Sequence, residues 1–61
     1  MAEREITSIV WRHDGERIDV IYVDGEPDRL IGTRGVAAEL AESVGLTVTP
    51  TPPGVVRWVR S

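Results

Sequence analysis

The stretch Ile6–Val23, ITSIVWRHDGERIDVIYV, decides the fold. It contains two runs rich in β-branched and aromatic residues, Ile6–Arg12 and Arg17–Val23, separated by residues 13–16 (His-Asp-Gly-Glu). Such side chains favour strands, and an Asp-Gly pair between two such runs is a strong hairpin signal. The stretch therefore predicts two antiparallel strands joined by a tight turn.

A helix is predicted downstream of this hairpin. Residues 24–28 (Asp-Gly-Glu-Pro-Asp) favour a turn, and Arg29–Ile31 is compatible with a short third strand. Thr33 is a typical helix N-cap and Gly45 a typical stop after the last turn. Between them, apolar residues recur with the spacing of one helix face, at Val36, Ala37, Leu40, Ala41 and Val44.

Two further strands are predicted after the helix, at Leu46–Thr49 and Val55–Arg60, with Pro53-Gly54 suited to the centre of a type II turn between them. The order strand-strand-(strand)-helix-strand-strand indicates the α+β class, a small antiparallel sheet with one helix packed on one face. We expect a single domain over residues 1–61, with residues 1–5 frayed.

The size of the chain favours self-association. A domain of about 60 residues buries only about 60% of the surface that its unfolded chain exposes, and the 61 residues include no cysteine to form disulfides. The second strand has apolar residues on both faces, with Ile18 and Val20 on one side and Ile21 and Val23 on the other. One helix covers one face, so we expect a homodimer formed through a sheet face or edge.

Charge and hydropathy limit the class of partner. The ten acidic residues outnumber seven basic ones, all arginine, for a net charge of −3, which argues against a dedicated nucleic-acid binder. No apolar run approaches the roughly 20 residues that span a bilayer, and the charged start differs from a secretory signal. We expect a cytoplasmic protein with no membrane partner.

No pattern in the sequence predicts a catalytic residue, a cofactor or a metal. Asp24, Glu26 and Asp28 have the spacing of the first calcium-loop ligands, but the glycine and the closing glutamate of that loop are missing. His13 at a hairpin tip has no pocket for acid-base chemistry. Residues 32–35 (Gly-Thr-Arg-Gly) lack the longer frame of a phosphate-binding loop. We therefore do not expect an enzyme.

Two short segments resemble parts of DNA-binding domains. Residues 36–46 (VAAELAESVGL) resemble the first helix and turn of a helix-turn-helix, but the prolines in the following stretch exclude its recognition helix. Residues 29–33 (RLIGT) leading into 36–41 (VAAELA) resemble the strand-to-helix junction of integrase arm-type and plant ethylene-response domains. That resemblance implies a sheet laid in the major groove, with Arg and Trp as contacts. The acidic total, Asp19 and the extra C-terminal hairpin depart from that family pattern, and we assign no family.

The sequence favours a non-enzymatic interaction or regulatory module that binds a protein partner, with Trp11, Tyr22 or Trp58 as anchors and arginines at the rim. A core position for Trp58 is the competing interpretation. The alternative function is a nucleic-acid-binding accessory protein, which requires Arg12, Arg17, Arg57 and Arg60 to share one face and an affinity that falls steeply with salt. The candidate surface residues are Trp11, Arg12, Arg17, Tyr22, Arg57, Trp58 and Arg60.

Overall fold

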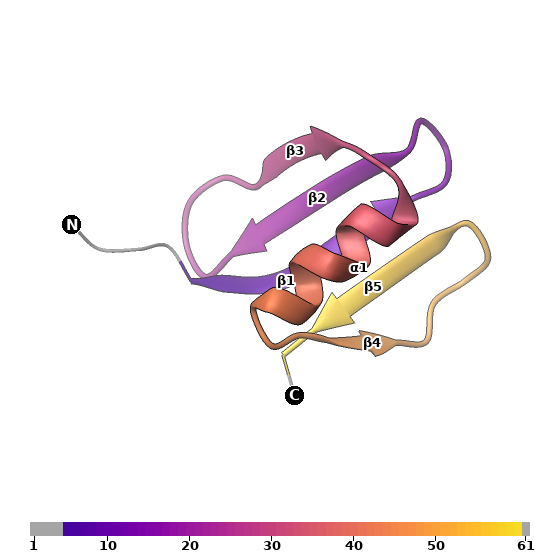
Figure 1. Ribbon diagram of the computed structural model, residues 1–61. Coiled ribbons are helices and arrows are strands. Elements are labelled where there is room, and N and C mark those ends of the chain that lie inside the picture. The colour runs from indigo at the N-terminus through magenta and orange to yellow at the C-terminus, as the bar shows by residue number, and fades with distance from the viewer. Residues whose placement is uncertain (1–4, 61) are drawn as a thin grey trace.

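The computed structural model, which describes residues 5–60, is an antiparallel five-stranded sheet with one helix lying across one face (Figure 1). The spatial order of the strands is β3-β2-β1-β5-β4, so that β1 is central. The α+β class and the single helix on one face are confirmed. The elements are β1 (Ile6–Arg12), β2 (Arg17–Tyr22), β3 (Asp28–Ile31), α1 (Arg34–Ser43), β4 (Thr47–Thr49) and β5 (Val55–Val59).

The predicted turns lie where the strands reverse. In the β1–β2 hairpin Arg12 pairs with Arg17, and the four intervening residues include Gly15 at φ 78° and Glu16 at φ 48°. Between β4 and β5, Gly54 has φ 88°, and the Val55 amide donates to the Pro52 carbonyl at 3.3 Å. The Asp-Gly and Pro-Gly signals therefore mark both reversals correctly.

Both helix boundaries are also confirmed. The Thr33 hydroxyl accepts a hydrogen bond from the Val36 amide at 3.3 Å, as an N-cap does. At the other end Gly45 adopts φ 79°, and the Leu46 amide donates to the Ala41 carbonyl at 2.9 Å. The helix presents Ala37, which is fully buried, and small residues of this kind let α1 approach the sheet closely.

The core lies between α1 and the sheet. The Trp11 indole Nε1 donates to the Gly32 carbonyl at 3.0 Å, which ties the central strand to the junction between β3 and α1. Each side chain of the cluster is at most 8% exposed. Its members are Ile9, Trp11, Ile18, Val20, Ala37, Ala41, Leu46 and Trp58.

The strand ends differ slightly from the sequence predictions. Val23 follows β2 and is 64% exposed, Leu46 precedes β4 as a buried residue, and Arg60 follows β5. Of the residues expected to fray, 1–4 lie outside the described residues. The Glu5 carbonyl accepts a hydrogen bond from the Val23 amide at 2.8 Å, which ties Glu5 to the end of β2.

Candidate functional site: an arginine-bearing sheet face

The register of the sheet separates two faces. Residues directly opposite each other on neighbouring strands share a face, and successive residues of a strand alternate between faces. Ile9 lies opposite Val20 and Trp58, and these residues form the face that α1 covers. Val10 lies opposite Asp19 and Arg57 on the other face, which we call the open face. Its residues are Ser8, Val10, Arg12, Arg17, Asp19, Ile21, Arg29, Ile31, Thr47, Thr49, Val55, Arg57 and Val59.

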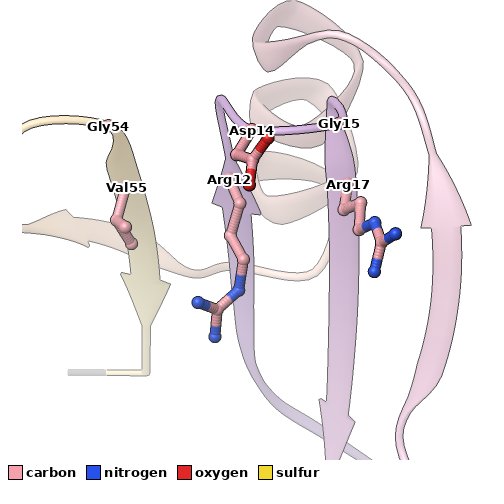
Figure 2. A pocket seen from close by; sticks show the side chains of 6 residues that line it. All are labelled: Arg12, Asp14, Gly15, Arg17, Gly54 and Val55. Atoms are coloured by element: carbon pink, nitrogen blue, oxygen red, sulfur yellow. The ribbon is translucent and has the colours of Figure 1, made fainter.

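Four exposed arginines gather on the open face from four strand positions. Arg12 is opposite Arg17, Arg29 is opposite Asp19, and Arg57 is opposite Val10. Figure 2 shows the guanidinium groups of Arg12 and Arg17 on adjacent strands, on the side of the sheet away from the helix. The fold thus brings together three arginines that the sequence singled out and adds Arg29.

Two shallow hollows lie among these side chains. One, of about 300 Å³, is at the hairpin end of the face and is lined by Arg12, Asp14, Gly15, Arg17, Gly54 and Val55 (Figure 2). At this end the β1–β2 turn is joined to the β4–β5 turn, because the His13 amide donates to the Gly54 carbonyl at 2.9 Å. The neighbouring hollow, of about 290 Å³, is lined by Arg12, Arg17, Asp19 and Arg29.

Charge is segregated between the open face and the rest of the chain. Four arginines against Asp19 leave the strand residues of this face at +3, whereas the whole sequence is −3, so that the remainder carries −6. Asp14 borders the cluster at the hairpin end, and Glu26 borders it near Arg29. The open face is therefore positively charged and bordered by acidic residues, although the net charge of the sequence is −3.

The aromatic residues predicted as anchors are on the other face. Trp11 and Trp58 are 8% and 5% exposed beneath α1, so both belong to the core, as the competing interpretation of Trp58 held. Tyr22 packs against the same cluster and its hydroxyl donates to Asp28 Oδ2 at 2.6 Å. In the described part of the chain, the open face has no aromatic side chain.

Arg60 does not join the arginine cluster. Its guanidinium donates to the Val44 carbonyl at 3.3 Å and to the Ile6 carbonyl at 2.5 Å, so it secures the C-terminal end of α1 and the start of β1. The nucleic-acid alternative required Arg60 to share a face with Arg12, Arg17 and Arg57, and that requirement is met by the other three but not by Arg60. The alternation along the last strand already contained the signal, because Arg60 has the parity of the buried Trp58 and Arg57 does not.

Neither a metal site nor a membrane-spanning helix is found within residues 5–60. Among these residues, no group of three or more His, Asp or Glu side chains is placed to hold a metal ion. Within the same range, no helix combines the length and the apolar character needed to cross a membrane.

No protein-family model matches the chain, and no curated protein or solved structure is significantly similar to it. Function must therefore be inferred from the chemistry of the open face. Guanidinium groups grouped on one surface fit anionic ligands, phosphate and carboxylate above all.

Proposed function

We propose that this chain is a nucleic-acid-binding module that contacts the phosphate backbone with its open face. The observation that carries the proposal is the grouping of Arg12, Arg17, Arg29 and Arg57 on one side of the sheet. Arginine offers a planar fork of N–H donors that matches phosphate oxygens. Neutralised phosphates release counterions, which is the main source of nonspecific affinity for nucleic acid.

The spacing of the cluster favours a duplex. Arg29 and Arg57 lie in one row across the sheet, with Asp19 and Val10 between them, and three strand spacings put their Cα atoms about 14 Å apart. The major groove of B-DNA is about 12 Å wide, so the two side chains suit phosphates on opposite sides of one groove. Stacking on single-stranded bases relies on aromatic side chains, which this face lacks among the described residues.

The net charge sets the expected strength of binding. The acids outside the face repel a polyanion, but at physiological ionic strength the Debye length is about 8 Å. Acids farther than that from the bound phosphates are largely screened. We expect an affinity in the nonspecific range of about 10⁻⁴–10⁻⁶ M at physiological salt, with tighter binding at low salt.

The test is fluorescence anisotropy of a labelled mixed-sequence duplex, titrated with the protein at several salt concentrations. With up to four phosphate contacts, log K should fall with log salt with a slope of about −3 to −4, and Arg57→Ala should reduce that slope by about one. Arg34→Ala is the matched control, because it removes one arginine at the first residue of α1, outside the open face. Absence of binding at low salt, or equal losses in both variants, would contradict the proposal.

A second candidate function is binding of a protein partner, including a second copy of this chain. The observation that favours it is the edge strand β3, whose four residues are all exposed, with Leu30 at 46% and Ile31 at 86%. An exposed edge offers unpaired backbone groups to another strand. Sedimentation velocity over a wide concentration range tests the homodimer: a concentration-dependent dimer supports it, and a constant monomer contradicts it.

The main proposal gives the chain no catalytic step and no cofactor. It includes a cytoplasmic location, which the lack of cysteine in the 61 residues favours.

A further inference from the structure

Asp19 is the one acid among the strand residues of the open face. It lies between Val10 and Arg29 in the sheet register, and with Arg12, Arg17 and Arg29 it lines one of the two hollows. Its side chain is 22% exposed, against 56% for Arg12. Asp19 is therefore recessed among longer cationic side chains that extend beyond it.

Asp19 forms an ion pair with Arg12. Arg12 Nε lies 3.6 Å from Asp19 Oδ2, which is a single contact and not a two-point fork. A partly exposed pair with this geometry contributes little and is easily exchanged. It nevertheless reduces the repulsion among the like charges that the fold places together.

We propose that Asp19 is an internal counter-ion that occupies the place of a ligand phosphate in the free protein. This inference rests on the proposed function, because it assigns a role within the same site. When a phosphate arrives, Arg12 exchanges the carboxylate of Asp19 for the phosphate oxygens, and the ligand also experiences repulsion from the carboxylate. Asp19 thus stabilises the free arginine cluster and weakens binding.

Loss of Asp19 should therefore lower the stability of the free protein and raise its affinity for duplex. A merely structural role would lower the stability without raising the affinity. In Asp19→Asn, the arginines lose their partner and the ligand loses its competitor. From the energy of a surface ion pair of this kind, we expect Asp19→Asn to bind duplex up to about fivefold more tightly than the wild type at low salt. The same loss lowers Tm by up to about 4–8 °C in a domain of this size.

The experiment measures duplex anisotropy and thermal unfolding for the wild type, Asp19→Asn and Glu39→Gln. Glu39→Gln removes the same charge from an exposed position on α1, so it reports the effect of net charge alone. We expect tighter binding with a lower Tm for Asp19→Asn, and a much smaller change in affinity for Glu39→Gln. In an Arg12→Ala background, the gain in affinity from Asp19→Asn should shrink, because the guanidinium for which carboxylate and phosphate compete is then absent.

Asp19→Thr serves as a second variant, since threonine favours strands and asparagine does not. Equal gains for the Asp19 and Glu39 variants would overturn the proposal in favour of a general charge effect. Weaker binding after loss of Asp19 would overturn it by making Asp19 itself a ligand contact. If neither the wild type nor any variant binds duplex, while Asp19→Asn still lowers Tm, the proposed function is refuted. The proposed competition between Asp19 and phosphate is then refuted as well.

Discussion

The two faces of this one sheet differ in composition, although they are built from the same strands: the covered face is apolar, whereas the open face mixes aliphatic side chains with four arginines. On the covered face, Ile9, Ile18 and Trp58 are at most 5% exposed beneath α1. On the open face, at the neighbouring positions, Arg57 and Arg17 stand exposed. The alternation of side chains along a strand thus buries one set of residues beneath the helix and leaves the arginines of the other set exposed.

The largest effect is expected where the two faces meet in adjacent residues, Arg57 and Trp58 of β5. Trp58→Ala should destabilise the fold by about 3–5 kcal/mol, because it leaves a cavity under α1. A chain of this length has about 3–9 kcal/mol of stability in all, so the substitution should remove a third or more of it. Arg57→Ala should cost about 0.5 kcal/mol or less. Denaturant unfolding followed by circular dichroism measures both.

Comparable losses of stability in Trp58→Ala and Arg57→Ala would contradict the conclusion that the covered face provides most of the stability. That outcome would mean that the aliphatic part of Arg57, which lies beside Val10, contributes as much packing as a buried indole. Val10 is only 9% exposed although no helix covers it, so some contribution of the arginine stems to the packing is expected.

Much of the fold follows from local signals in the sequence. Asp14-Gly15, Thr33, Gly45 and Pro53-Gly54 each mark a reversal or a helix end at the place where the structure has one. These signals are reliable because backbone conformation at turns and caps depends on the residue itself. The spatial order of the strands is different, since it depends on which strand pairs with β1 from the far end of the chain.

The site was less predictable than the fold. Side-chain alternation shows which neighbours in the same strand share a face with Arg12 or with Arg17. Only the register between strands puts these two residues opposite each other and brings Arg57 to the same side. Arg29 was missed although a short strand was predicted there, because only the pairing with β2 places Arg29 opposite Asp19 on the open face. Trp11 was taken as a surface anchor because an aromatic residue fits both a core and an interface, and composition does not distinguish them.

A smaller effect is expected at the rim of the covered face, where packing extends to Gly32. A Cβ atom there would lie 2.8 Å from Ile18 Cδ1, so Gly32→Ala should cost about 1–2 kcal/mol. In an Ile18→Val background, which lacks that methyl group, the cost should fall by about 1 kcal/mol. Gly35→Ala is the matched control, because its nearest neighbour would be Thr33 Oγ1 at 3.9 Å. Removing a helical glycine should there raise stability by about 0.5–1 kcal/mol.

Thermal unfolding of the four variants measures these changes. Additive costs for Gly32→Ala and Ile18→Val would show that the junction moves to accept the extra atom. In that case the contact between Gly32 and Ile18 would not be part of the rigid packing of the covered face.

The smallest effect is expected in the hairpin turn that joins the two arginine-bearing strands. Glu16 has φ 48°, a conformation that costs a residue with a Cβ about 1–2 kcal/mol. Glycine relieves that cost but loses more chain entropy on folding, so Glu16→Gly should raise stability by about 0.5 kcal/mol net. Glu16→Gln removes the same charge and keeps the Cβ, and it should leave stability unchanged. Both variants remove an acid next to Arg17, so any gain in duplex affinity should be equal in the two. Equal stabilisation by glutamine and glycine would mean that charge, and not backbone conformation, sets the stability of this turn.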